Sequence, residues 1–319
     1  MRTEAMQYTA PSIARIHGYH NGMWGTETYA QSGFRVNKYF TSDRFELLEE
    51  DGDGNWYRKS GEPFKGIGIE KETQCDTITE ESVLAEVFDK IIFKAFKDPD
   101  MWKMQEDGSL GGHTSVECIT QVMTIGRLRN EYANFRKMYH YFKAFGIETE
   151  SSETNCGMHV NISRALLGDT EAQQDENVRK LFYIINRHYD TCRQLFHRTG
   201  STEWCGQMYY GNIRTADLSE VPNDHRKCVN LSHWYAGGAA RVEIRLVGGQ
   251  KNYACFRNTM ESVIHLVNRV RTLKWNELDD LVKIFKGCNQ HVYDRLTVCG
   301  LSYDTLRKIE TTVKTVEWQ

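Results

Sequence analysis

The stretch Arg241-Val-Glu-Ile-Arg245, inside Ala-Ala-Arg-Val-Glu-Ile-Arg-Leu-Val at residues 239–247, alternates charged with branched apolar side chains. Side chains of a β-strand point alternately to opposite faces, so this alternation predicts a strand that carries Arg241, Glu243 and Arg245 on one face. An antiparallel sheet with one face in solvent produces the same alternation. A single run of this kind therefore does not distinguish a functional face from an ordinary solvated one.

Two earlier stretches repeat the alternation. Residues 68–72 place two glutamates on one face of a strand, and residues 157–163 place a histidine, an asparagine and a serine on one face. The polar residues concerned are Glu70, Glu72, His159, Asn161 and Ser163. Three strands that each present chemically active groups on one face favour a shared site over three unrelated solvated surfaces.

The remaining sequence predicts two more strands among amphipathic helices. Residues 115–119 are a short strand candidate that carries Glu117, and residues 227–232 are another that carries Asn230. Apolar residues at helical spacing predict helices at about 77–98, 128–146, 178–196, 256–270 and 278–286. Strands and helices are interspersed, and the alternation is typical of antiparallel pairing. We therefore expect an α+β fold rather than a doubly wound α/β fold.

The chain of 319 residues is long enough for a large core and shows no internal repeat, linker or low-complexity tract. We expect a single domain over residues 1–319, with a strand-rich N-terminal segment at 1–65, a core at 66–270 and a C-terminal helical extension at 271–319. Acidic residues and glycine alternate at 49–55, as in a calcium loop. Trp56 stands where such a loop needs glycine, so a hairpin turn is the better interpretation.

Charge and cysteine usage exclude some classes of function. The net charge of -3 gives no global basic field, which argues against nucleic acid as a partner. The nine cysteines are odd in number and contain no Cys-x-x-Cys pair, which predicts free, mostly buried thiols in a reducing cytoplasm. No apolar run reaches the about 18 residues of a membrane span, and the N-terminus lacks a signal-peptide core. We expect a cytoplasmic protein with no membrane partner.

The acidic positions favour metal chemistry on phosphate. Glu70 and Glu72 lie one strand repeat apart, about 7 Å, so two hard cations could share bridging phosphate oxygens between them. His159 adds one imidazole, but no closed set of nitrogen and sulfur ligands suits zinc, so Mg2+ or Mn2+ is expected. The arginines on the Glu243 strand could clamp a transferring phosphoryl group. Because the chain has no glycine-rich phosphate loop, metals and arginines would have to hold a nucleotide.

These motifs carry a family resemblance. Three of them resemble, in chain order, the metal and phosphate motifs of the glutamine synthetase and glutamate–cysteine ligase superfamily: Gly68-x-Glu70-x-Glu72, Gly157-Met-His159-Val and Arg241-x-Glu243-x-Arg245. Further stretches resemble the amidoligases of that superfamily, which are met in phages and bacterial gene clusters: Asp107-Gly-Ser-Leu followed by Glu117, Cys-Gly-Met-His-Val, Val229-Asn-Leu231 and Val-Glu-Ile-Arg-Leu. The resemblance covers about residues 66–270, the amidoligase core of a single catalytic domain.

The resemblance implies a glutamine synthetase-like curved antiparallel sheet, an open barrel with helices packed outside, which binds ATP with Mg2+ or Mn2+. The metal ligands would be Glu70, Glu72, Glu117, His159 and Glu243. Arg245 and Arg241 would be catalytic, with Arg245 on the transferring phosphate. Residues that would contact the nucleotide or the substrate are Arg198, Arg226, Lys227 and Asn230. Asn161 stands where the family motif commonly has a second histidine, which would change the substrate pocket.

The implied activity is ATP-dependent amide formation from a small-molecule or peptide carboxylate and an amine, through an acyl phosphate. The general base and the oligomeric state stay open, and the location would be the host cytoplasm if the chain is encoded by a phage. Two alternatives remain at this point. One is a metal-dependent hydrolase that uses the same carboxylates to activate water. The other is a nucleotide-binding protein that has lost turnover.

Overall fold

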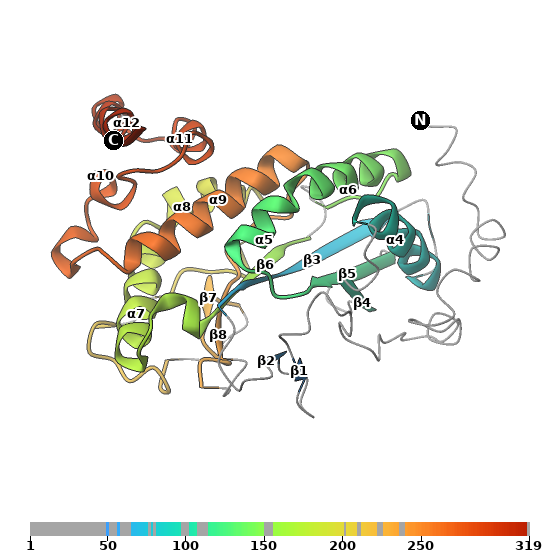
Figure 1. Cartoon of the computed structure of the whole chain (residues 1–319), viewed down its shortest axis with the longest axis horizontal. Coiled ribbons are helices and arrows are strands. Elements are labelled where there is room, and N and C mark those ends of the chain that lie inside the picture. The colour runs from blue at the N-terminus through green and yellow to red at the C-terminus, as the bar shows by residue number, and fades with distance from the viewer. Residues whose placement is uncertain are drawn as a thin grey trace.

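Six strands form one open sheet in the order β4-β5-β3-β6-β8-β7, and every neighbouring pair is antiparallel (Figure 1). The strands are β3 (Ile67–Cys75), β4 (Trp102–Glu106), β5 (Thr114–Thr120), β6 (Met158–Ser163), β7 (Val229–Asn230) and β8 (Arg241–Ile244). The computed structural model describes residues 49–50, 56–57, 65–75, 78, 81–96, 102–106, 114–149, 156–200, 202–208, 212–221, 226–235 and 240–317.

Helices alternate with these strands along the chain, which confirms the predicted α+β class. They are α4 (Glu81–Phe96), α5 (Ile125–Asn130), α6 (Tyr132–Phe145), η4 (Arg164–Leu167), α7 (Glu171–Arg187), α8 (Tyr189–Leu195), α9 (Tyr253–Val270), η6 (Trp275–Glu277), α10 (Leu281–Ile284), α11 (Gln290–Leu296) and α12 (Tyr303–Glu317). None of the helices within the described ranges combines the length and the apolar character needed to cross a membrane.

The longest strand, β3, shows why the two faces of the sheet differ. Its residues Ile67 and Ile69 are fully buried on one face, whereas Glu70 and Glu72 are half-buried on the other. Lys71 departs from the alternation, because it is fully buried on the apolar face with its ammonium group 5.3 Å from the centre of the Tyr139 ring. A cation over an aromatic face is a favourable arrangement in such an apolar environment. The sheet thus separates an apolar face from a polar one.

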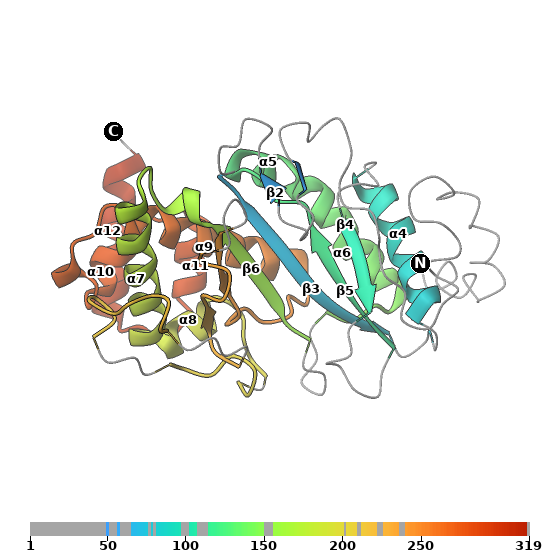
Figure 2. The ribbon, with the colours of Figure 1, turned by 90° about the horizontal axis from the view of Figure 1, so that it is seen from below.

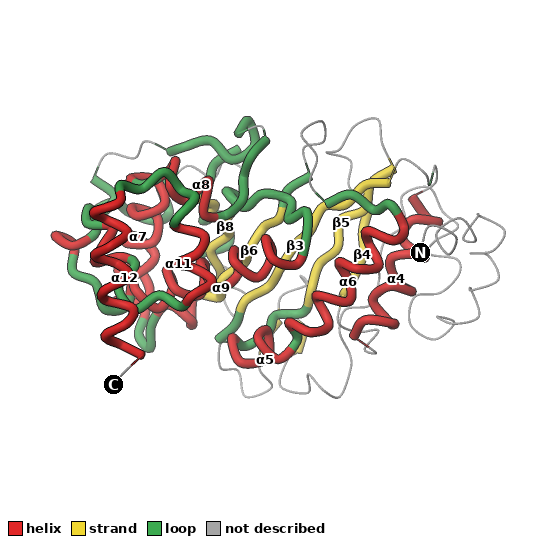
Figure 3. Tube along the Cα trace, turned by 90° about the horizontal axis from the view of Figure 1, so that it is seen from above, coloured by secondary structure: helices red, strands yellow, loops and turns green. Residues whose placement is uncertain are grey.

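Helices α4, α6 and α9 lie on one side of the sheet (Figures 1 and 3). Phe135 of α6 stacks on Phe256 of α9 with ring centroids 4.4 Å apart, and Phe135 also meets Trp102 of β4 edge-on at 5.9 Å. Burying one such aromatic side chain contributes about 1.5–3 kcal/mol. In the view from below, no described helix lies in front of β3, β5 and β6 (Figure 2). The polar face of the sheet therefore points away from this helical layer.

The helix predicted at 128–146 begins earlier and is divided. The Thr124 hydroxyl accepts a hydrogen bond from the backbone N–H of Arg127 at 3.1 Å, so α5 begins at Ile125. The chain leaves the helix at Glu131 and re-enters it as α6. Gly146 then ends α6 with φ of 67°, a left-handed conformation that favours glycine, as the sequence predicted.

The later helices also differ in extent. A capping box between Thr170 and Gln173 starts α7 at Glu171, before the predicted start, and His188 divides the predicted helix into α7 and α8. Helix α9 agrees with the prediction at 256–270. The helix predicted at 278–286 is wrong in length, because only the turn α10 forms after the cap at Asp280.

Two strands are shorter than predicted. Only Val229–Asn230 of the stretch 227–232 is a strand, because the Asn230 side chain accepts a hydrogen bond from Ser232 N at 2.9 Å and turns the chain. The strand predicted as far as Val247 ends at Ile244. Arg245 N and the following backbone N–H both donate to the Cys228 carbonyl, at 2.9 and 3.3 Å, which interrupts the ladder. Strand β4, by contrast, was not predicted.

Some predictions fall on residues outside the described ranges. These are most of the strand-rich segment 1–65, the capping residues Thr77 and Glu80, and the turn at 107–110. Strands β1 (Glu49–Glu50) and β2 (Trp56–Tyr57) pair antiparallel, as a hairpin requires, although the turn between them also lies outside. All nine cysteines are free and buried, which confirms the prediction for the thiols.

Candidate metal and phosphate site

The register of the sheet gathers the predicted acids on its polar face. Residues directly opposite each other on antiparallel strands have side chains on the same face. The opposed pairs are Glu70 with His159, Glu72 with Glu117, Asn161 with Glu243, and Asn230 with Glu243. Side chains from β3, β5, β6, β7 and β8 therefore lie side by side, although the chain separates Glu70 from Glu243 by 173 residues.

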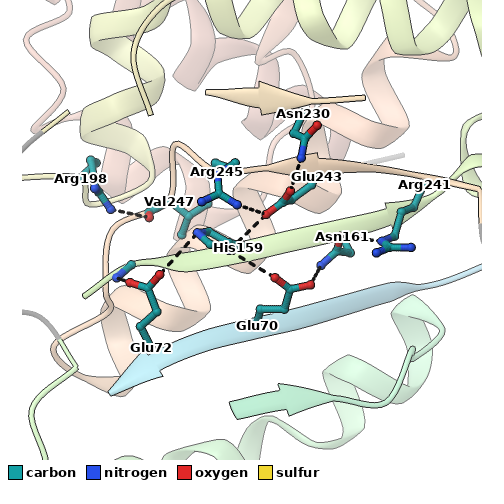
Figure 4. A network of polar contacts seen from close by, with 11 residues as sticks. Glu70, Glu72, His159, Asn161, Arg198, Asn230, Arg241, Glu243, Arg245 and Val247 are labelled. Carbon is teal, nitrogen blue, oxygen red and sulfur yellow. Dashed lines mark hydrogen bonds and ion pairs between the residues drawn. The ribbon is translucent and has the colours of Figure 1, made fainter. Parts of the chain in front are cut away.

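His159 lies at the centre of this group (Figure 4). Its Nδ1 lies 3.1 Å from Glu243 Oε1 and 3.3 Å from Glu70 Oε2, and its Nε2 lies 3.8 Å from Glu72 Oε1. The imidazole is 10% exposed, and the side chains of Glu72 and Glu243 are 13% and 9% exposed. Three carboxylates thus surround one imidazole in a largely desolvated setting.

The ionisation of this group follows from its mutual contacts. Burial raises the pKa of the Glu70 carboxyl, but the hydrogen bond and charge of His159, with help from Asn161 and Arg241, outweigh burial and lower this pKa to about 2. Burial lowers the pKa of His159. The three glutamates around it, Glu70, Glu243 and Glu72, raise this pKa to about 9 overall. At neutral pH a protonated imidazole therefore balances part of the carboxylate charge.

Two asparagines orient the carboxylates. Asn161 Nδ2 donates to Glu70 Oε1 at 2.8 Å, and Asn230 Nδ2 donates to Glu243 Oε2 at 2.8 Å. Arg241 Nε in turn donates to Asn161 Oδ1 at 3.1 Å. Both asparagines are buried, so each fixes one oxygen of a carboxylate and leaves the other oxygen facing His159. Asn161 also joins Arg241 to the cluster, which the sequence did not disclose.

Glu72 lies at the end of the cluster opposite to Arg241 (Figure 4). Its Oε2 accepts a short hydrogen bond from the backbone N–H of Gly157. A side-chain carbon on Gly157 would lie 3.1 Å from Arg198 Nη1 and 3.2 Å from Glu72 Oε2, so glycine lets both groups approach the β6 backbone. Arg198 is buried and donates to the Val247 carbonyl at 3.4 Å. Of the two residues next to Glu72, Gly157 and Arg198, only Arg198 was predicted as a site residue.

Arg245 lies just beyond the end of β8. Its Nη1 lies 2.7 Å from Glu243 Oε1, the oxygen that also contacts His159. Its Nε is buried and has no hydrogen-bond partner within the part of the chain that is described. A ligand with acceptor oxygens would satisfy this donor.

The cluster contains a set of groups that could hold a cation. Ligand atoms of Glu70, Glu117 and His159 all lie within 4.8 Å of one another. Oxygen-rich sets with a single imidazole suit Mg2+ or Mn2+ better than zinc. Glu72 and Glu243 contact the same imidazole and so lie next to this set. All five predicted metal ligands are thus brought to one place.

The two other predicted contacts lie further along the chain. Arg226 is exposed, and its guanidinium lies 4.8 Å from the centre of the Trp204 ring. Lys227 is partly buried and pairs with Gly206 in an isolated parallel bridge. Of the residues predicted to contact nucleotide or substrate, Asn230 and Arg198 directly adjoin the carboxylates or the Glu72 end of the cluster, whereas Arg226 lies at the Trp204 ring.

One local feature of the site escaped the sequence. His197, which precedes Arg198, has φ of 56° and is the one non-glycine residue with positive φ among the described residues. Such a conformation is uncommon for residues other than glycine, and it changes the direction of the chain after α8. A side-chain carbon on Gly248 would overlap the His197 carbonyl oxygen, so this turn packs directly against the segment after β8. The Gly-Gly pair at 248–249 was the available signal for this close approach.

Comparison with known proteins does not add to this description of the site: no family model matches the chain, and no curated protein sequence matches it significantly.

Proposed function

We propose that this chain is an ATP-dependent carboxylate–amine ligase with a glutamine synthetase-like fold, of the amidoligase type. The observation that supports this most is the convergence of three separate motifs, around Glu70, His159 and Glu243, on one polar sheet face with arginines at both ends. Carboxylates with flanking arginines suit a reaction in which metal-bound phosphate gains charge.

The donor set fits Mg2+ or Mn2+. Glu70, Glu117 and His159 would hold the cation, with Glu72 and Glu243 adjacent to it. A cation bound there would neutralise phosphate charge during transfer. Hydrogen bonds from Asn161, Asn230 and the Gly157 backbone hold Glu70, Glu243 and Glu72 in place around His159.

The three arginines Arg245, Arg198 and Arg241 have different roles in this proposal. Arg245 would donate from its unsatisfied Nε and from Nη2 to oxygens of the transferring phosphoryl group, a planar two-point contact that arginine makes well, while Nη1 stays on Glu243. Arg198, at the Glu72 end, would contact the remaining phosphates, and Arg241, held by Asn161, would orient the substrate carboxylate from the other end.

The reaction then proceeds in two steps. The substrate carboxylate attacks the γ-phosphorus of ATP, the bond from that phosphorus to ADP breaks, and an acyl phosphate forms. An amine then attacks the acyl carbon, phosphate leaves with the C–O electron pair, and the amine loses a proton. The proposed substrates are a small-molecule or peptide carboxylate and an amine.

The test is a measurement of ADP release with pools of carboxylates and amines, each supplied alone and together, in the presence of ATP and Mg2+. The ligase proposal expects release that requires both pools and that is lost in Glu243→Gln. Glu171→Gln, which replaces a carboxylate that is 86% exposed, is the matched control and should retain the rate.

The alternatives give different results in the same assay. Phosphate release from ATP or from a phosphoester with water alone, unaffected by either pool, would identify a metal-dependent hydrolase and overturn the ligase proposal. Binding of ATP and Mg2+ without release of ADP under any combination would identify a binding protein that has no turnover.

A further inference from the structure

An exposed indole lies two residues before Gly206, whose backbone is hydrogen-bonded to the segment that leads into β7. Trp204 is 37% exposed, the most exposed of the four tryptophans whose burial is described, and the Arg226 guanidinium lies 4.8 Å from the centre of its ring. Large aromatic side chains are normally buried, so a tryptophan that keeps part of its ring in solvent invites a functional explanation. Arg226 is exposed as well.

Short backbone connections tie this pair to the phosphate end of the cluster. Trp204 precedes Cys205 and Gly206, and Gly206 exchanges backbone hydrogen bonds with Arg226 and Cys228 at 2.8 and 3.0 Å. The Cys228 carbonyl then accepts the backbone N–H of Arg245 at 2.9 Å. Trp204 is thus two residues before Gly206, and Arg226 is two residues before Cys228, whose carbonyl accepts the Arg245 hydrogen bond.

The Cys205 thiol gives a second link. Burial raises its pKa, and the charges of Arg198 and Arg245 lower it, so this thiol lies close to both guanidinium groups. Cys205 is fully buried and directly follows Trp204. The residue after Trp204 is therefore within electrostatic range of both Arg198 and Arg245.

We propose that the Trp204 ring, with Arg226 stacked on it, is the platform on which the base of the bound nucleotide lies, with its phosphates extended toward Arg198 and Arg245. This inference rests on the proposed function. Every nucleobase has a π-face, and stacking on an aromatic ring that also carries a guanidinium is a general way to bind one. The site would take a nucleoside triphosphate rather than a free polyphosphate.

A second tryptophan–arginine pair provides an internal control. The Arg214 guanidinium lies 5.6 Å from the centre of the Trp275 ring. Trp275 Nε1 donates to Glu176 of α7 at 2.6 Å, and its ring packs against Tyr183, so this pair belongs to the helical end of the molecule and not to the sheet face. Substitution at Trp275 changes the same kind of pair away from the candidate site.

The experiment compares Mg·ATP with Mg·tripolyphosphate by isothermal titration calorimetry on the full chain. Tripolyphosphate presents the same phosphates without a base. The wild type should bind Mg·ATP more tightly than Mg·tripolyphosphate. Trp204→Leu should weaken Mg·ATP binding about tenfold or more, and leave Mg·tripolyphosphate within about twofold. Trp204→Phe, which keeps a ring, should retain most of the affinity, and Trp275→Leu should match the wild type for both ligands.

Each other outcome counts against the platform. If Mg·ATP binds tighter than Mg·tripolyphosphate and Trp204→Leu keeps that difference, the base lies elsewhere while the proposed function stands. If the wild type binds both probes equally, no base is recognised and the platform is wrong. If neither probe binds the wild type, the proposed nucleotide-dependent function fails together with the platform. Thermal melting of each variant identifies losses of affinity that come from unfolding. If Trp204→Leu does not fold, the affinity of Trp204→Phe for Mg·ATP decides the question.

Discussion

The guanidinium of Arg245 lies 2.7 Å from the carboxylate of Glu243, two positions earlier in the chain. On a regular strand these side chains would leave the same face about 7 Å apart and run parallel. They meet because β8 ends at Ile244 and the backbone of Arg245 turns to the Cys228 carbonyl. The ion pair leaves Arg245 Nε without a partner among the described residues, so the pair satisfies Glu243 and keeps a buried donor for a ligand.

This geometry predicts the effect of Arg245→Lys. Lysine can pair with Glu243, so folding should be unchanged, but it lacks the planar pair of donors that grips two phosphate oxygens. The rate of ADP release should fall on the order of 100-fold, with Mg·ATP affinity within a few fold. Arg187→Lys, at an exposed pair with Asp279, is the control and should keep the parent rate. A rate for Arg245→Lys within about threefold of the parent would show that the ion pair is only structural.

A second prediction concerns the stability contributed by Glu70. Its pKa is lowered to about 2, so the folded state favours the charged carboxylate, and Glu70→Gln should lower the free energy of unfolding at pH 6 by about 1–3 kcal/mol. A group with a lowered pKa stabilises the fold above its unfolded pKa and loses that effect as pH falls. The difference between parent and variant should therefore shrink below about pH 4.5, the ordinary value, and vanish toward pH 2. Denaturant titrations at several pH values measure it; a difference that persists at low pH would mean that the charge is not responsible.

A third prediction follows from the protonated state of His159. Its pKa is raised to about 9, and a histidine must be neutral to coordinate a metal, so binding of Mn2+ at pH 7.5 should release about one proton. Affinity for Mn2+ should rise as pH increases from 7 toward 9. Calorimetry in two buffers with different ionisation enthalpies counts the protons. Proton release that is the same in His159→Gln and in the parent would exclude this imidazole as the ligand that gives up its proton.

The same raised pKa has a consequence for stability without metal. A group with a raised pKa stabilises the fold fully below its unfolded value, here 6.5, and loses that effect as pH rises through the folded value of about 9. His159→Gln should therefore destabilise the metal-free protein at pH 6 more than at pH 9.5. Thermal melting in chelator at the two pH values checks the sign, which would be reversed if His159 were neutral in the fold.

Two glycines give a matched pair of stability predictions. A side-chain carbon on Gly249 would overlap the carbonyl oxygens of Thr149 and Cys156, both of which are backbone atoms, so Gly249→Ala should cost more than about 2 kcal/mol. Gly126 is exposed in α5 with nothing near the position of its side-chain carbon, so Gly126→Ala should stabilise by about 0.5–1 kcal/mol. Equal effects of the two substitutions in urea denaturation would contradict the close approach at Gly249.

The sequence by itself determined the sidedness of the sheet. Alternation of polar or charged with apolar residues in 157–163 and 241–245, and the spacing of Glu70 and Glu72 in 68–72, follow from the period of two of a strand, and the structure confirms which side chains share a face. The α+β class, helix α9 and the glycine that ends α6 were predicted for equally local reasons, namely apolar spacing and the left-handed backbone that glycine permits. Glu70, His159 and Glu243 could be named because each lies in such an alternating run.

Only the tertiary structure decided how these groups meet. Strand register, set by packing between distant segments, puts Glu70 opposite His159 and Asn161 opposite Glu243, and no local pattern contains that information. The early end of β8 depends on a hydrogen bond to Cys228, which is close only in the folded chain, and it converts Arg245 from a strand residue into the partner of Glu243. Periodicity is a property of neighbours in sequence, whereas ion pairs, raised and lowered pKa values and buried donors are properties of neighbours in space.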